Sequence, residues 1–292
     1  MFRVYIQVLY DSGGPAKQEY EPLNDALNYF RTKIPLAEWK AASEEVTRIF
    51  GPEFIDSIAG HAYLKPYGYP GDFEVIDKMY LEVISKHSML KKWDLFYHQH
   101  AAATAVRNRK AFFKNILEEK TKNKANVCQV LDVASGPCRD LLEFFQETKA
   151  TNIHIECVEA DAKAVEHATK LNKANLQQIT FTNKNIFRFR TEKKYDLIWS
   201  AGLFDYFDDR TFVRLVRRLI TNVAPGGELI IGNFAVGNPT EGYMELFTGW
   251  YLHHRSPEQL IRLAQEAGIE DVNRITVDQE EVGVNLFLRI QF

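Results

Sequence analysis

Short apolar runs alternate with amphipathic segments from Val127 onward, and no other feature of the sequence constrains the fold as strongly. The runs span residues 127–133, 153–158, 178–181, 195–200, 228–231, 271–277 and 283–290. Strands that are apolar along their whole length are typical of a parallel sheet with crossover helices on both faces. Only a short polar turn separates the last two runs, so we expect them to pair as an antiparallel hairpin. The sequence therefore predicts an α/β fold with a seven-stranded sheet, mostly parallel, whose last strand is antiparallel.

Two helices between these strands have recognisable ends. Segment 210–223 places its apolar residues on one face, and Asp208 or Asp209 is positioned to cap its start. Pro225-Gly226-Gly227 should form the turn that ends it. The other helix should run from Ser256, its N-cap, to Ala267.

Before this half, the apolar residues recur three and four positions apart, as in helices. We therefore expect residues 1–120 to form a helical N-terminal cap domain and residues 121–292 to form the sheet domain. The polar stretch 118–126 is the expected boundary, and the last helix before it should run from about residue 94 to 120. Tyr67-Gly68-Tyr69-Pro70-Gly71-Asp72 is a turn by composition.

The first eleven residues alternate between polar and apolar side chains, with Val4, Ile6 and Val8 apolar. We expect an edge strand or a loose end there. Arg3 and Tyr5 interrupt any signal-peptide core.

Composition excludes several classes of protein. The formal net charge of −3 gives no reason to expect binding to nucleic acid or to an anionic membrane. No apolar run approaches the roughly 20 residues that a membrane span needs. Cys128, Cys138 and Cys157 lack the spacing of a metal site or of a disulfide framework, so we expect reduced thiols, no metal and a cytoplasmic location. The sequence does not indicate an oligomeric state.

A turn of small residues follows the first strand, at Asp132-Val133-Ala134-Ser135-Gly136-Pro137-Cys138. Such a turn at the carboxyl end of a parallel strand lets the backbone come close to a ligand. Ala134 and Cys138 stand where glycines are usual, and each Cβ restricts φ. A pyrophosphate cradle is therefore not expected, and a cofactor without phosphate at this point fits better.

The next two strand ends carry polar side chains. Glu159, at the end of the second run, lies 23 residues after Gly136, a spacing at which such folds place a carboxylate against ribose hydroxyls. Ala160 follows it, and Asp161 is expected to be a helix N-cap. After the third run, Asn185-Ile186 could contact an adenine, although Asn185 alone also fits an ordinary turn.

The fourth run ends in Ser200 and Ala201, followed by the aromatic residues Phe204 and Tyr206. Small residues beside an aromatic cluster could form the floor of a pocket. Core packing explains Phe204 equally well.

Together these strand ends resemble class I S-adenosylmethionine-dependent methyltransferases, over residues 127–292. The resemblance implies a Rossmann-like methyltransferase sheet that binds S-adenosylmethionine. Tyr67–Phe73, Ala105–Arg109, Ser200–Tyr206 and Trp250–Ser256 also resemble a bacterial group labelled for biosynthesis of 3-hydroxypalmitic acid methyl ester. The expected cofactor contacts are Asp132, Ala134, Ser135, Gly136, Glu159, Ala160, Asn185, Ile186, Ser200, Ala201, Tyr69 and Arg107, with Arg109 as the alternative to Arg107.

The long aromatic segment 232–255 is expected to cover the acceptor. Its candidate acceptor contacts, with those after the fourth strand, are Phe204, Tyr206, Tyr243, Trp250 and Arg255. Candidate bases are His253, His254 and Tyr206, although a histidine is more often structural, so no base is assigned.

We expect a small-molecule methyltransferase acting on oxygen of an acid or hydroxyl, with a fatty-acid carboxylate as the specific hypothesis. An N-methyltransferase, an NAD-type dehydrogenase and a cofactor-binding module without turnover are the alternatives. The missing glycines argue against the dehydrogenase.

Overall fold

The computed structural model describes residues 2–122 and 126–292, and they divide into two compact units. The helical unit comprises Met1–Arg107 and Gly237–Tyr251, and the sheet unit comprises Asn108–Val236 and Leu252–Phe292. This division differs from the expected one at residue 120. The boundary falls inside helix α7 (Ala101–Lys122), and the segment 237–251 belongs to the helical unit although it follows the fifth strand.

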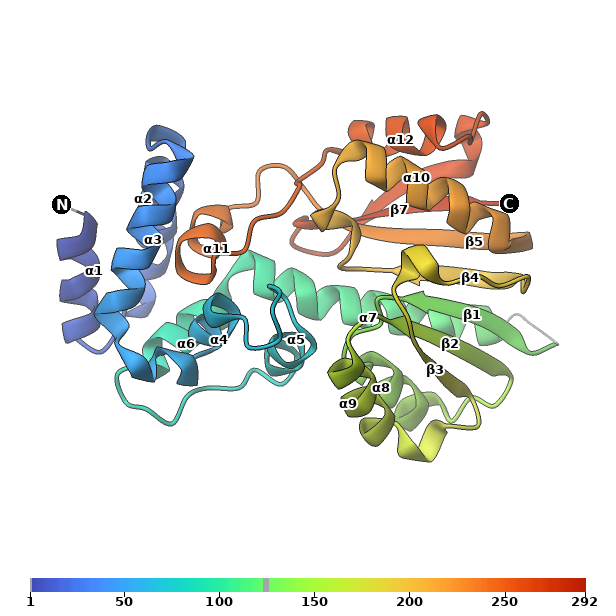
Figure 1. Cartoon of the computed structure of the whole chain (residues 1–292), viewed down its shortest axis with the longest axis horizontal. Helices are drawn as coiled ribbons and strands as arrows, with labels where there is room; N and C mark the ends of the chain where they lie inside the picture. Colours follow the sequence, from blue (N-terminus) through green and yellow to red (C-terminus); the bar gives the residue numbers. More distant parts are fainter. Residues whose placement is uncertain (1, 123–125) are drawn as a thin grey trace. The chain divides into compact units, whose positions relative to one another are not determined.

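The sheet unit contains seven strands, which confirms the predicted fold class (Figure 1). They are β1 (Cys128–Val133), β2 (Ile153–Glu159), β3 (Ile179–Asn183), β4 (Tyr195–Ser200), β5 (Val223–Phe234), β6 (Ile275–Gln279) and β7 (Asn285–Gln291). Their order is β3-β2-β1-β4-β5-β7-β6. Strands β1 to β5 pair in parallel, whereas β7 pairs antiparallel with both β5 and β6. The order therefore reverses between β1 and β4, the position at which open parallel sheets bind ligands.

Strand β5 is longer than expected because it includes the predicted turn. Tyr195 pairs with Val223, but Leu197 pairs with Glu228, so the register shifts around Pro225 and Gly226. Gly226 has a φ of +77°, and its N–H donates to the carbonyl of Phe292. The Pro-Gly-Gly segment is thus an irregularity inside the strand instead of a turn before it.

Helices cover both faces of the sheet (Figure 1). They are α7, α8 (Arg139–Thr148), α9 (Ala162–Leu171), α10 (Asp209–Leu219) and α12 (Pro257–Glu266), with short 3-10 turns at Lys173–Asn175, Ile186–Arg188, Phe204–Tyr206, Ile220–Asn222 and Val272–Arg274. Two predicted caps are confirmed, since Asp208 accepts the N–H of Thr211 and Ser256 accepts that of Gln259.

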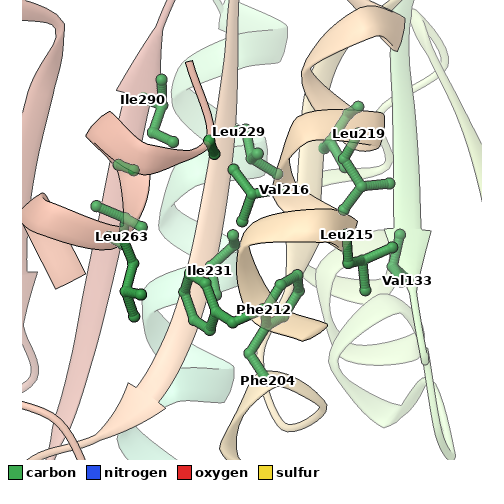
Figure 2. Close-up of a cluster of buried hydrophobic side chains, with 14 of the residues drawn as sticks. Val133, Phe204, Phe212, Leu215, Val216, Leu219, Leu229, Ile231, Leu263 and Ile290 are labelled. Atoms are coloured by element: carbon green, nitrogen blue, oxygen red, sulfur yellow. The ribbon is translucent and has the colours of Figure 1, made fainter. Parts of the chain in front are cut away.

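Two apolar clusters hold these layers together. On one face, Phe212, Leu215 and Val216 of α10 and Leu263 of α12 pack against strand residues such as Ile231 (Figure 2). On the other face, side chains of α7, α8 and α9 pack on β1, β2 and β4. Burial of an apolar side chain of this size stabilises the fold by about 1.5–3 kcal/mol. The ends of the strands are thereby fixed in position.

The helical unit consists of helices and short turns. They are α1 (Phe2–Asp11), α2 (Tyr20–Lys33), α3 (Leu36–Phe50), α4 (Ile58–Leu64), α5 (Phe73–Tyr80), α6 (Lys91–Gln99), the start of α7, and α11 (Glu241–Thr248), with 3-10 turns at Lys17–Glu19 and Pro52–Asp56. Arg31 of α2 forms ion pairs with Glu241 and Glu245 of α11. Ser43 of α3 donates to the carbonyl of Leu246. These contacts explain why segment 237–251 folds with the N-terminal helices.

Two expectations for this half are wrong. The first residues form helix α1 instead of a strand, because Ile6 and Leu9, three positions apart, are the buried ones, whereas Val4 and Val8 are exposed. The helix expected over 94–120 is broken at His100, whose ψ of 141° is extended. Its buried ring donates from Nε2 to Asn24 Oδ1 at 3.0 Å, and it packs on Tyr243.

Burial of His100 should make the helical unit sensitive to acid. Burial lowers the pKa of His100 to about 3, whereas an unfolded histidine titrates near 6.5. Below about pH 6.5 the unfolded chain takes up a proton that the folded chain does not, so stability falls by roughly 1.4 kcal/mol per pH unit. His100→Gln keeps a donor for Asn24 and removes this titration. Its unfolding free energy should therefore fall less than that of the wild type between pH 7 and 4.

Urea unfolding followed by tryptophan fluorescence measures this difference, since Trp39, Trp93 and Trp250 belong to the helical unit. Burial raises the pKa of Asp94 to about 6, which acts in the opposite direction because the folded state then holds a proton that the unfolded state releases. Both proteins share Asp94, so the comparison isolates His100. Equal pH slopes for the two proteins would contradict the assignment.

Candidate functional site

The turn between β1 and α8 has an unusual backbone conformation. Ala134, Gly136 and Cys138 have φ values of +57°, +57° and +52°. Residues with a Cβ were expected to avoid this left-handed region, which costs them roughly 1–2 kcal/mol each, yet Ala134 and Cys138 adopt it. The N–H of Ala134 donates to the carbonyl of Val158 at 2.8 Å, and Asn172 Nδ2 donates to that of Cys138 at 3.0 Å. The surrounding structure thus holds the turn in its strained form.

The same turn presents space and an unused polar group. A Cβ built on Gly136 would meet no atom within 4 Å, so the backbone there is open to a ligand. The Oγ of Ser135 is buried, and no residue in the described part of the chain hydrogen-bonds to it. Buried polar atoms nearly always have a partner. Both observations fit a bound group at this turn.

Glu159, at the end of β2, connects this turn to the next one. Its Oε2 accepts the N–H of Gly136 at 3.1 Å and its Oε1 accepts that of Asp161 at 2.9 Å. Burial raises its pKa, and the two N–H groups counteract that effect. Each carboxylate oxygen has a second lone pair, so Glu159 can still accept from hydroxyl groups of a ligand.

Two further carboxyl groups lie nearby, those of the buried Asp132 and the half-buried Asp140. Burial, together with the charges of Asp140 and Glu159, raises the pKa of Asp132 well above its usual value. No hydrogen-bond donor to the Asp132 side chain is found among residues 2–122 and 126–292. Burial also raises the pKa of Asp140 to about 6, against the effects of the Leu141 N–H and of Lys110 and Arg109. A site with one buried and two half-buried acids favours cationic groups.

Asparagines shape the turn after β3. Asn183 donates from Nδ2 to the carbonyls of Glu159 and Ala160, at 3.0 Å each. The Asn185 side chain accepts the N–H of Phe187, as in the ordinary turn that the sequence also allowed. Ile186 is buried. Asp161 caps α9 through the N–H of Lys163, as expected.

At the end of β4, Ser200 Oγ donates to the carbonyl of Val133 at 3.0 Å, which ties β4 to β1. Ala201 and Gly202 follow, and a Cβ on Gly202 would lie 3.2 Å from both Nη1 and Nη2 of Arg109. Arg109 is half-buried, and no hydrogen-bonded or ion-paired partner for it is found in the described ranges. Its guanidinium is therefore available to an anionic ligand.

The structure corrects the expectation for Arg255. This residue is 3% exposed, and its guanidinium donates to Phe204 O, Phe207 O, Asn233 Oδ1 and Asp209 Oδ1. These bonds use all five N–H donors of an arginine. Arg255 is thus a structural residue with no donor left for an acceptor carboxylate.

The other expected residues of the sheet unit lie close to Arg255. Phe204 is fully buried in the core (Figure 2), which agrees with core packing, the alternative to a pocket floor. Tyr206 is half-buried on the same 3-10 turn. The N–H of His253 donates to the carbonyl of Asp205, and its side chain is exposed. His254 is half-buried; burial raises the pKa of Asp205, and His254 is one of the groups that counteract this effect.

The remaining expected residues belong to the helical unit. Tyr69 is half-buried. Arg107 donates from Nη2 to His98 O at 2.7 Å and to Thr104 Oγ1 at 3.1 Å, while its buried Nη1 has no hydrogen bond in the described part of the chain. Tyr243 and Trp250 are buried. For all four residues, ligand contact remains a prediction.

Sequence reasoning missed several residues of this site. Asp140 and Asn183 were detectable in principle, since each directly follows a predicted strand or its turn. The roles of Asn172 and Asp205 could not be recognised from the sequence, because they come from long-range contacts. Asn172 donates to the carbonyl of Cys138, 34 positions earlier, and Asp205 accepts the N–H of Phe234 at the end of β5.

Loss of the Arg255 guanidinium should destabilise the sheet unit. Arg255→Met removes the donor to Asn233 Oδ1 and to the Phe207 carbonyl and leaves a cavity in place of the buried guanidinium that pairs with Asp209, so the free energy of unfolding should fall by about 3 kcal/mol. Arg262→Met is the matched control, since Arg262 also pairs with Asp209 but is 56% exposed and should contribute less than about 1 kcal/mol. Thermal denaturation of both variants measures this difference. Equal effects would contradict a structural role for Arg255.

Residues 130–227 match the family model described as a methyltransferase domain. This segment contains the β1 turn, Glu159, the β3 turn and the end of β4. No curated protein matches the chain.

Several solved structures share the fold. A possible exported protein from Bordetella parapertussis is 20% identical, with a TM-score of 0.62, over 75% of this chain and 79% of that one. The S-adenosylmethionine-dependent methyltransferase SibL is 14% identical, with a TM-score of 0.52, over 69% of this chain and 58% of that one. The CurJ carbon methyltransferase is 11% identical, with a TM-score of 0.51, over 62% and 53%. At these identities the similarity establishes the fold alone.

Among the described residues, no helix has both the length and the apolar character that crossing a bilayer requires. The family match and the strand order agree with each other. Residues 130–227 therefore form a methyltransferase domain within the sheet unit.

Proposed function

We propose that this enzyme methylates a small apolar molecule on oxygen, at a carboxyl or hydroxyl group. The observation that carries the cofactor part is the Glu159 carboxylate, which joins the β1 and β2 turns beside the open backbone of Gly136. The finer proposal, a medium or long fatty acid that can be 3-hydroxylated, rests on the resemblance of four sequence segments to the methyl-ester group.

We propose the following cofactor contacts at these turns. Glu159 would accept from the ribose hydroxyls, and Asn185 and Ile186 would contact the adenine. Gly136 and Ser135 would lie along the methionine part, with Asp132 facing its ammonium group. Ser200, Ala134, Ala160 and Ala201 complete the proposed lining.

Arg109 is the stronger candidate for the methionine carboxylate. It is half-buried, it lies against Gly202 at the end of β4, and no hydrogen bond or ion pair to it is found among the described residues, although its charge acts on Asp140 and Asp205. Arg107 uses Nη2 to bind His98 and Thr104, and the same atom lies 3.9 Å from Glu82 Oε1, which leaves Nη1 and Nε. A guanidinium with all its donors free binds a carboxylate in the favourable bidentate geometry.

For the acceptor, no well-placed base is found among the candidate residues that the structure describes. When bound, the cofactor supplies an electrophilic methyl group, and the enzyme has to place the acceptor oxygen in line with it. A carboxylate is already a nucleophile and needs no base. His253 is exposed, and the ring of His254 lies 6.1 Å from that of Phe234. A carboxylate acceptor is therefore favoured, because its methylation requires no base from these residues.

The aromatic residues of the helical unit form its own core. Tyr243 stacks on Phe247, with ring centroids 4.5 Å apart, and Trp93 lies 5.5 Å from Phe247. All three rings are buried, so they offer no surface to an acceptor. The proposal of an apolar acceptor therefore rests on the resemblance of the sequence segments. Methylation of a small amine is the second candidate, since the shared fold does not decide the acceptor atom.

Glu159→Gln should weaken cofactor binding. The amide replaces one acceptor oxygen by a donor, so one of the two backbone N–H groups loses its partner and the ribose contacts become weaker. We expect the Kd for S-adenosylhomocysteine to rise about 10- to 100-fold in calorimetry, equivalent to about 1.4–2.7 kcal/mol. Glu166→Gln, on the exposed face of α9, is the control and should bind normally. An unchanged Kd for Glu159→Gln would rule out the ribose contact.

Arg109→Gln should weaken binding only of ligands that carry the methionine carboxylate. Its Kd for S-adenosylhomocysteine should rise at least about tenfold, the scale of one charge-assisted contact. Its Kd for 5′-methylthioadenosine, which lacks the amino-acid part, should stay as in the wild type. Arg107→Gln provides the comparison. If Arg107→Gln shows this selective loss and Arg109→Gln does not, the assignment of the two arginines is reversed.

The carboxylate proposal predicts a flat pH profile. With 3-hydroxypalmitic acid as acceptor, the rate should change little between pH 6 and 9, because the acid is ionised throughout. Mass fragmentation of the product should place the methyl group on the carboxyl oxygen. A rate that rises steeply over this range, or transfer to amines and not to acids, would contradict a carboxylate acceptor and favour a base such as His254.

A further inference from the structure

Three buried side chains with metal-binding atoms converge beneath the β1 turn. They are Asp132 of β1, Cys138 at the start of α8 and Cys157 of β2, and their ligand atoms all lie within 4.8 Å of one another. The β1–β2 register pairs Asp132 with Cys157, and the left-handed turn returns Cys138 to them. This group was not expected from the sequence, because its members come from separate elements and lack the spacing of a metal site.

The distances fit a tetrahedral ion. Cys138 Sγ and Cys157 Sγ are 3.9 Å apart. Two zinc–sulfur bonds of about 2.3 Å at a tetrahedral angle place the sulfurs roughly 3.8 Å apart. A disulfide would instead need them at about 2 Å. Ser135 O, which is 3.6 Å from Cys138 Sγ, lies close enough to take part as a fourth ligand.

The charges also favour a cation. Asp132 is 3% exposed and no donor to its carboxylate is found in the described ranges. Asp140 and Glu159 add negative charge around it, and neither supplies a donor. A buried carboxylate without a partner is costly, and a divalent ion in contact with it removes that cost. The two sulfurs select a thiophilic ion over magnesium or calcium.

We propose that Asp132, Cys138 and Cys157 bind one thiophilic divalent cation, Zn²⁺ or Cd²⁺, directly beneath the β1 turn. Each thiol releases its proton to the buffer as its sulfur bonds to the ion, so two protons leave for each ion bound. The open backbone at Gly136 provides a path to Cys138, whose sulfur is 3.9 Å from the Gly136 carbonyl oxygen. The proposal does not depend on the identity of the methyl acceptor or on turnover.

Cadmium titration of the full chain tests this site. The reduced, chelator-treated protein should develop thiolate-to-cadmium absorption in the ultraviolet that saturates at one ion per chain. Cys128→Ser removes the third buried thiol, which lies outside the group, and should behave as the wild type. Cys138→Ser and Cys157→Ser should each lose most of the signal, and Asp132→Asn should bind at least about tenfold more weakly.

Absence of the absorption in the wild type, or a signal in Cys138→Ser and Cys157→Ser as strong as in the wild type, would overturn the proposal. Circular dichroism checks that each variant is folded. If a cysteine variant does not fold, X-ray absorption of the zinc-loaded wild type decides the question. Two sulfur ligands with oxygen in the remaining positions support the site, and a shell without sulfur overturns it.

Discussion

The Glu159 carboxylate is the contact on which the site depends. It accepts one N–H from the turn after β1 and one from the turn after β2. Two backbone segments that come from different parts of the chain are therefore fixed against a single side chain. Because the β1 turn is strained at Ala134 and Cys138, it needs such external support. The acid expected to bind ribose thus also positions the turn that lies next to it.

Charge in this region reflects the needs of binding more than those of stability. Asp132 is buried with the half-buried Asp140 and Glu159 close to it, and burial together with these two charges raises the pKa of Asp132. Such an arrangement disfavours the folded chain unless cationic groups are bound there. A cofactor with an ammonium and a sulfonium group suits this environment, and so does the divalent ion proposed beneath the same turn.

Many strands and helix starts of the sheet unit could be predicted, because they depend on residues that are close together in the sequence. Apolar runs specified the strands, and Asp208, Asp161 and Ser256 specified helix starts through bonds to residues two or three positions away. The features that could not be predicted depend on long-range packing. Burial of the His100 ring breaks a continuous helical pattern, and segment 237–251 joins helices that lie some 200 residues earlier.

Arg255 shows the same limit at the level of one side chain. In the sequence it stands beside two histidines in an aromatic segment and resembles a ligand contact. In the fold, two carbonyls, an amide and a carboxylate converge on it from three other segments. No pattern around residue 255 encodes those partners. Glu159 was predicted correctly to lie at a strand end, but its two backbone partners became evident only from the structure.

The central claim is that the turns joined by Glu159 bind S-adenosylmethionine and its product. Thermal denaturation with added S-adenosylhomocysteine or NAD tests it most directly. At about 100 times its Kd, S-adenosylhomocysteine should stabilise the folded state by about 2.7 kcal/mol and raise the Tm by roughly 5 °C. NAD should leave the Tm unchanged. A rise in Tm with NAD and none with S-adenosylhomocysteine would contradict the account.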